Sequence, residues 1–143
     1  MIQSDKFDSS NMDIKKLSNT ALMFVIKRLI EILAICISLF GILMFIALIS
    51  YSPDDPNFIF PDNTIIKNIL GYQGSFISDF LLQSVGLVAY LIPITFIFTG
   101  TNIFRKKEIF LLIENTFFMV IYSLFGSLFF NIFYVETFTL YIN

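Results

Sequence analysis

The sequence predicts an all-α integral membrane protein: a helical bundle of three transmembrane helices with an extracytoplasmic loop that contains a short amphipathic helix. Hydrophobic residues make up 57% of the 143 residues and charged residues only 14%, whereas soluble domains average roughly half and a quarter. Three apolar segments, at positions 29–50, 81–100 and 109–133, are long enough to cross the ~30 Å hydrocarbon core.

The first span, 29–50, contains one charged residue, Glu31. A cleaved signal peptide would have an apolar region of about 7–15 residues that ends in a small-residue site. This segment is longer and leads into YSPDDP, so we expect an uncleaved signal anchor. Residues 1–28 are rich in Ser, Asn, Asp and Lys and are expected to form a mobile cytoplasmic tail.

The second span, 81–100, has no charged residue. Pro93 lacks a backbone N–H, so we expect a kink near the middle of this helix. The third span, 109–133, is rich in Phe and contains Glu114 near its start. Only residues 101–108 separate the two spans, which predicts a tight cytoplasmic turn in an antiparallel hairpin.

The basic residues indicate the orientation, because Lys and Arg in short loops stay on the cytoplasmic side. The loop 51–80 carries only Lys67, and the tail 134–143 carries no basic residue. Eight basic residues lie on the opposite side of the membrane: Lys6, Lys15, Lys16, Lys27, Arg28, Arg105, Lys106 and Lys107. The N-terminus is therefore predicted to be cytoplasmic, with 51–80 and 134–143 periplasmic.

The periplasmic loop begins with SYSPDDPNF, positions 50–58. Pro53 and Pro56 cannot continue a helix, and Asp54 and Asp55 readily cap a local turn. This stretch is therefore expected to end the first span at the outer interface of the membrane.

A short amphipathic helix is predicted later in the same loop. Four apolar residues would share the side of this helix that faces the membrane: Ile65, Ile66, Ile69 and Leu70. Gly71 suits the C-cap of such a helix, and the following residues suit a turn.

The composition excludes most familiar chemistry. The chain has no His and one cysteine, Cys36, which excludes imidazole catalysis, His-based metal sites and an internal disulfide. No glycine is followed by Lys, so there is no phosphate-binding loop. Asp54 and Asp55 lack the glycine turn and the distal Glu of a calcium loop. We therefore predict no enzyme, no cofactor and no metal site, and the net charge of −2 argues against nucleic-acid binding.

Ionisable groups inside membrane helices are candidates for function. Both Glu31 and Glu114 lie near a cytoplasmic helix end, where Glu31 can pair with Lys27 and Glu114 with Lys106 or Lys107. The alternative is a role in a proton or ion path, in which case the chain would be a subunit of a small channel or transporter.

Small residues recur on each predicted span and allow close helix approach in lipid. They are Ala34, Ser38 and Gly41 in the first, Gly86 and Ala89 in the second, and Ser123, Gly126 and Ser127 in the third. These faces are expected to pack within the chain or between subunits.

From about Lys27 to Gly100 the sequence resembles the N-terminal four-helix membrane domain of the FtsK/SpoIIIE DNA translocases. The S-[YF]-[SN]-P-x-D-P motif of that family matches Ser50, Tyr51, Ser52, Pro53, Asp55 and Pro56. A second motif, N-x-x-G-x-x-G-[AS]-x-x-[AS]-D, matches Asn68, Gly71, Gly74, Ser75, Ser78 and Asp79. Two motifs in the right order and spacing make the resemblance fairly specific.

The resemblance implies a module that anchors a DNA translocase in the bacterial inner membrane and brings it to the division septum. It implies divisome proteins as partners, the lipid bilayer as surroundings and a homo-oligomer in the full-length protein. ATP and Mg²⁺ would belong to the motor of such a protein, which this chain does not contain. The chain also ends before a fourth helix, so we expect an N-terminal fragment or the product of a split or truncated gene.

Overall fold

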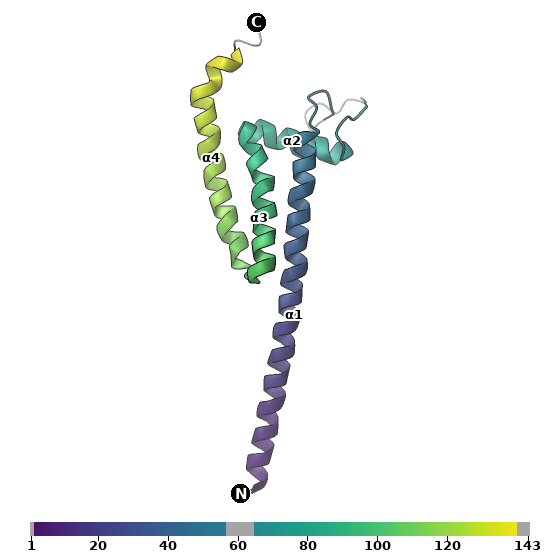
Figure 1. The fold of residues 1–143 in the computed structure, drawn as a ribbon, viewed down its shortest axis with the longest axis vertical. Helices are drawn as coiled ribbons and strands as arrows, with labels where there is room; N and C mark the ends of the chain where they lie inside the picture. Colours follow the sequence, from purple (N-terminus) through teal and green to yellow (C-terminus); the bar gives the residue numbers. More distant parts are fainter. Residues whose placement is uncertain (1, 57–64, 140–143) are drawn as a thin grey trace.

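A computed structural model of the chain describes residues 2–56 and 65–139. The described elements are α1 (Ile2–Ile49), α2 (Gly71–Val85), the short 3₁₀ helix η1 (Gly86–Tyr90), α3 (Leu91–Lys106) and α4 (Phe110–Thr139). In Figure 1, α1, α3 and α4 stand side by side with α3 in the middle, and α2 lies across the end of α1. No strand occurs within these described residues.

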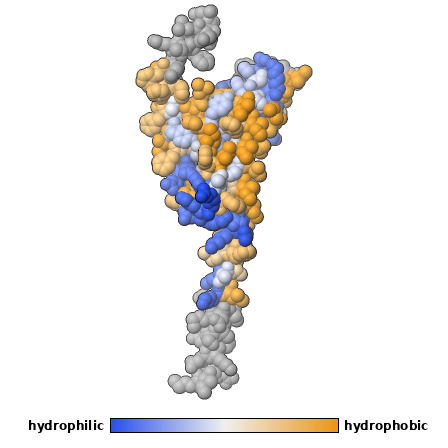
Figure 2. Space-filling view, in the orientation of Figure 1, coloured by the Kyte–Doolittle hydropathy of each residue, from blue (hydrophilic) through white to orange (hydrophobic). Residues whose placement is uncertain are grey.

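Three helical segments are long and apolar enough to cross a membrane: Asn19–Ile49, Gly71–Lys106 and Phe110–Phe133. Figure 2 shows a hydrophobic surface between two hydrophilic ends of the bundle. The predicted all-α fold with three membrane helices is therefore confirmed.

The first helix is longer than its predicted span. It ends at Ile49, close to the predicted position 50, but it begins at Ile2, so most of the expected tail 1–28 is helical. The polar composition of this tail suggested mobility, yet neither Gly nor Pro occurs before Gly41. Nothing in the sequence therefore interrupts the helix.

The second span differs most from its prediction. Residues 65–67 have no regular structure and residues 68–70 form a bend and turn, so the short helix of the loop lies later, at Gly71–Val85. Gly71 begins this helix, with φ of +66°. It was predicted to end a helix before it.

The chain changes direction at Gly86, where φ is +64°. A Cβ at Gly86 would meet no atom within 4 Å, so this glycine provides backbone freedom and not the predicted packing face. Pro93 is the third residue of α3, where a missing N–H costs no helical hydrogen bond. The predicted kink at Pro93 is therefore wrong, and the break in the span lies at Gly86.

Close contact between α1 and α3 forms the centre of the bundle. A Cβ on Gly41 would lie 2.8 Å from the carbonyl oxygen of Pro93, and one on Gly100 would lie 2.5 Å from that of Ala34. Ala34 is fully buried. The small-residue face of the first span therefore packs within the chain, as one of the two alternatives predicted. On α4, Gly126 similarly admits Val88 of η1, which a Cβ would meet at 2.8 Å.

Candidate functional site

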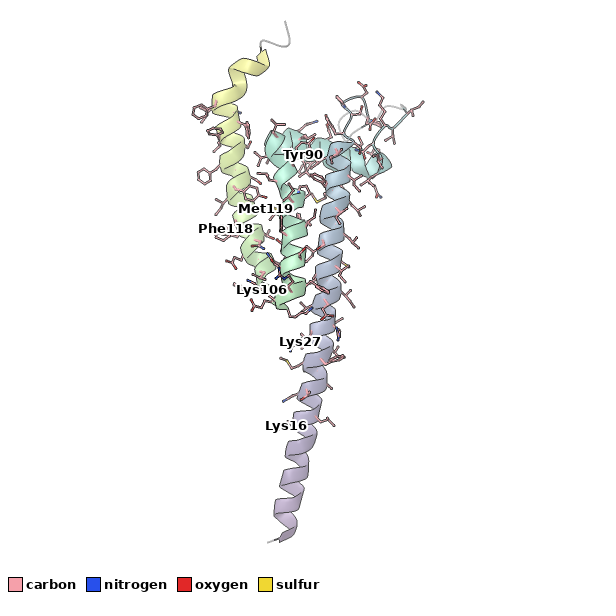
Figure 3. All side chains as sticks on the ribbon, in the orientation of Figure 1. Lys16, Lys27, Tyr90, Lys106, Phe118 and Met119 are labelled. Carbon is pink, nitrogen blue, oxygen red and sulfur yellow. The ribbon has the colours of Figure 1, made fainter. Side chains whose placement is uncertain are left out.

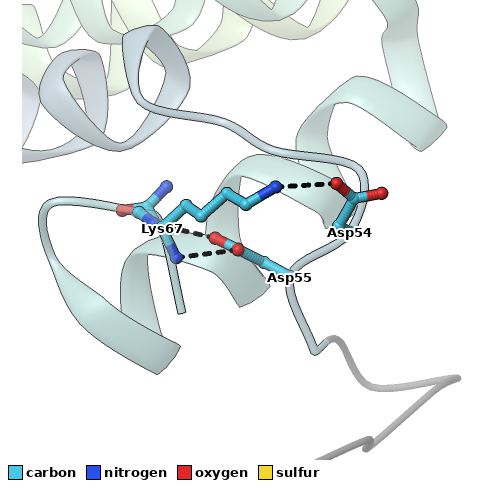
Figure 4. A network of polar contacts seen from close by, with 4 residues as sticks. Asp54, Asp55 and Lys67 are labelled. Carbon is cyan, nitrogen blue, oxygen red and sulfur yellow. Dashed lines mark hydrogen bonds and ion pairs between the residues drawn. The ribbon is translucent and has the colours of Figure 1, made fainter. Parts of the chain in front are cut away.

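The two sequence motifs meet at one end of the bundle, which we call the loop end (Ser50–Pro56 and Ile65–Asp79). Its centre is Asp55, which is only 4% exposed. One carboxylate oxygen accepts the backbone N–H of Lys67 at 2.8 Å and the other accepts that of Asn68 at 2.8 Å (Figure 4). Asp55 was predicted to cap a local turn, but it bonds residues 12 and 13 positions later and closes the loop.

This contact also explains why residues 65–70 are not helical. A helix needs its backbone N–H groups for its own carbonyls after the first turn. The N–H groups of Lys67 and Asn68 are instead bonded to Asp55. The predicted amphipathic segment therefore forms no helix and passes through a bend and turn at residues 68–70.

Asp54 forms an outer contact of the same loop. Its carboxylate lies 2.8 Å from the Lys67 ammonium, with both side chains well exposed (Figure 4). The hydrogen bond from Lys67 lowers the pKa of Asp54, and the same bond raises the pKa of Lys67. Exposed ion pairs contribute little to stability, so Asp55 is the stronger tie.

Asn68 connects the loop to the end of α1. Its side-chain amide donates to the carbonyl of Ala47 at 2.9 Å, and its side-chain oxygen accepts the N–H of Leu70 at 3.0 Å. A Cβ at position 74 would collide with that side-chain oxygen. Asn68 therefore requires glycine at Gly74, which links two positions of the second motif.

The last carbonyls of α1 are also bonded by side chains. The final four C=O groups of a helix lack partners within it. Here Ser50 donates to Ile46 at 2.8 Å, and Tyr90 donates to Leu48 at 3.2 Å. Ser50 also accepts the N–H of Ile69 at 3.2 Å. The helix end is thus capped by residues from the loop and from η1.

Asp79 forms a second buried carboxylate contact. Tyr51 donates its hydroxyl to one oxygen at 3.2 Å, and Gln83 donates its amide to the other at 2.7 Å. Burial, and then the hydrogen bond with Asp79, raise the pKa of Tyr51. Ser75 completes the contact between α2 and the loop by donating to the Pro56 carbonyl at 3.0 Å.

Most of the predicted signature residues therefore lie together at the loop end, in several groups of hydrogen bonds. They are Ser50, Tyr51, Asp55, Pro56, Asn68, Gly71, Gly74, Ser75 and Asp79, while Pro53 forms the turn before Asp55. Sequence reasoning missed Gln83 and Tyr90; only the four-residue spacing of Gln83 from Asp79 on a helix could have indicated it.

The chemistry of these residues is structural. Both carboxylate oxygens of Asp55 and of Asp79 accept bonds from protein donors, which join α2 and the loop to the end of α1. Among the described residues, no group of three or more Cys, Asp or Glu could hold a metal ion. The loop end fastens α2 to α1.

The opposite end of the bundle contains five basic side chains, which we call the basic end: Lys27, Arg28, Arg105, Lys106 and Lys107. Glu31 lies among them, 2.6 Å from Arg28 and 2.8 Å from Lys107. It therefore pairs with these two residues and not with the predicted Lys27. Glu114 was predicted to pair with Lys106 or Lys107, but it is exposed and makes no ion pair with any described side chain.

Comparison with known proteins gives the family. The model of the "4TM region of DNA translocase FtsK/SpoIIIE" matches residues 26–142. DNA translocases FtsK from Rickettsia bellii, Azospirillum brasilense and Shewanella oneidensis are 34%, 30% and 33% identical, over 54%, 60% and 72% of this chain.

The chain covers only 10%, 14% and 11% of the lengths of these three relatives. No solved structure matches the chain. The family match covers most of the chain, including most of the first apolar helical segment and all of the other two. The chain is a multi-pass membrane protein that belongs to the family of the 4TM membrane region of the FtsK/SpoIIIE DNA translocases.

Proposed function

We propose that this chain is the non-enzymatic anchoring module of a DNA translocase, holds it in the bacterial inner membrane and brings it to the division septum. In this role it serves cell division and chromosome segregation. The observation that carries the proposal is the family match over residues 26–142, a region distinct from the ATPase motor. The chain is an anchor in this proposal, and ATP and Mg²⁺ act elsewhere in the translocase.

The loop end supports a targeting role because it offers a fixed surface. Asp55, Asn68 and Asp79 hold α2 across the end of α1, and α2 exposes Tyr72, Phe76 and Phe80. A surface held in one conformation loses little entropy when a partner binds. Divisome proteins outside the cytoplasmic membrane are the proposed partners of the loop end, and oligomerisation would belong to the complete translocase.

Septal targeting can be tested with a fluorescent protein fused to the N-terminus of the full chain in dividing cells. We expect enrichment at the septum for the wild type and loss of enrichment for Asp55→Asn, with equal amounts in the membrane fraction. Asp54→Asn is the matched control, because it removes the same charge from an exposed position. Even distribution of the wild type around the envelope would refute septal targeting.

The proposed orientation places the basic end in the cytoplasm. Single cysteines in a Cys36→Ala background test it on intact spheroplasts with an impermeant thiol reagent. Ile65→Cys is expected to react, since Ile65 is 91% exposed at the loop end, and Lys106→Cys is expected not to react. The reverse pattern would overturn the orientation.

The channel or transporter alternative has lost most of its basis. It rested on Glu31, Glu114 and a kinked second span. Glu31 is bonded to two cations at the basic end, and Pro93 lies in the first turn of α3. Only Glu114 is left, and it is exposed on the surface of α4. Anchoring is therefore the function that we propose.

A further inference from the structure

The basic end lies at the depth of lipid headgroups. The Glu31–Lys107 ion pair, at 2.8 Å, ties α1 to the turn between α3 and α4. From Ile32 to Ile49 α1 rises about 27 Å at 1.5 Å per residue. This rise matches the ~30 Å hydrocarbon core. When the loop end lies at one membrane surface, the basic end therefore lies at the other.

Two of its cations are held in fixed positions. The two carboxylate oxygens of Glu31 bond Arg28 and Lys107 separately. The Arg28 guanidinium lies 5.0 Å from the ring centre of Phe24, and the Lys107 ammonium lies 4.0 Å from that of Phe104. These contacts restrain two flexible side chains before any ligand arrives, which lowers the entropy cost of binding.

The other three cations are not neutralised. Lys27, Arg105 and Lys106 are exposed, and no described acidic side chain pairs with them. Figure 3 shows Lys106 at the end of α3 and Lys27 on the adjoining part of α1. With Glu31 and Glu108 included, the basic end has a net charge of +3. It therefore attracts an anion.

Apolar side chains border these cations on the membrane side. Phe104, Ile109 and Phe110 are 44%, 49% and 70% exposed, which suits contact with acyl chains. We propose that the basic end is a binding site for the headgroup of an anionic phospholipid, with its acyl chains against the start of α4. Lipid fits better than free phosphate because charge and apolar surface adjoin each other.

The chain contains no Trp, so a single introduced Trp reports on neighbouring lipids without background. We would place it with Ile109→Trp in the full chain, reconstituted in phosphatidylcholine vesicles with a minority of phosphatidylglycerol. Bromine on the acyl chains of one lipid or the other quenches the Trp that the lipid touches. We expect brominated phosphatidylglycerol to quench several-fold more than its share of the bilayer predicts.

Neutralising the unpaired cations tests the charge without breaking the ion pairs of Glu31. In Lys27→Gln/Arg105→Gln/Lys106→Gln, we expect the preference for phosphatidylglycerol to fall by up to about fivefold per residue at low salt. Lys67→Gln is the matched control, since it removes a positive charge at the loop end. A reporter on η1, at the end of α3 away from the basic end, Leu87→Trp, is expected to show no preference.

Three results would overturn the proposal. The first is quenching of Ile109→Trp in proportion to bulk lipid. The second is an unchanged preference in the triple variant. The third is stronger displacement of the anionic lipid by inorganic phosphate than by chloride at the same ionic strength, which would indicate a site for a free anion.

Discussion

Replacing Asp55 is the sharpest test of how the loop end is held together. In Asp55→Asn the side chain keeps its shape, but one acceptor oxygen becomes an NH₂ donor that faces a backbone N–H. The variant loses one charge-assisted bond of about 1.5–3 kcal/mol and leaves one buried backbone donor of Lys67 or Asn68 unpaired. We expect the free energy of unfolding to fall by about 3 kcal/mol.

The measurement is the unfolding free energy of the purified full chain, from circular dichroism during titration of mixed micelles with a denaturing detergent. Asp54→Asn is the control, because it removes the same charge from an exposed side chain whose ion pair with Lys67 contributes little to stability. It should change the free energy by no more than about 0.5 kcal/mol. Equal values for the two variants would refute the assignment of Asp55 as the main tie of the loop.

Three further predictions concern other positions. Gly74→Ala should destabilise the protein by about 1–3 kcal/mol in the same titration, because its Cβ collides with the Asn68 side chain; a wild-type value would show that Asn68 moves aside freely. Gly86→Ala should cost about 1–3 kcal/mol from its backbone conformation alone, with φ of +64° and ψ of −140°, since its Cβ meets no neighbour, and a wild-type value would contradict this strained conformation. The pair of Asp54 with Lys67 lowers the pKa of Asp54 below its ordinary 3.8, so its small stabilisation is present above that value and disappears as pH falls through the lowered pKa. The difference between wild type and Asp54→Asn should therefore stay constant from about pH 6 to 8 and vanish in strong acid, whereas a difference that grows on acidification would contradict this sign.

The sequence predicted the number of membrane-spanning helices because their apolar runs depend on neighbouring residues alone. The break at Gly86 was not predictable in this way. Within an apolar segment, a glycine that allows close helix packing cannot be told from one at which the backbone changes direction. Pro93 suggested a kink only because the start of its helix was placed about ten residues too early. The number of spans follows from composition, whereas their internal boundaries depend on backbone geometry.

The contacts of the site were predictable only in part. The family motifs identified Asp55 and Asn68, but their bonds join residues 13 positions apart, and no local pattern gives such a pairing. Likewise Glu31 was expected to bond its helical neighbour Lys27, whereas Lys107 comes from a turn 76 positions later. Side-chain pairing across the bundle requires the packing of α1 against α3, which the sequence alone does not provide.

The closure of the loop by Asp55 has a practical consequence for engineering the chain. Asp55 and Ser75 secure the backbone at Pro56 on one side, and Asp55 secures it at Lys67 on the other. The distance between the two helices at this end is therefore set by these bonds and not by how many residues lie between positions 56 and 65. A variant that keeps Asp55 and Ser75 should therefore retain the contact between α1 and α2, whereas loss of either side chain releases one side of it.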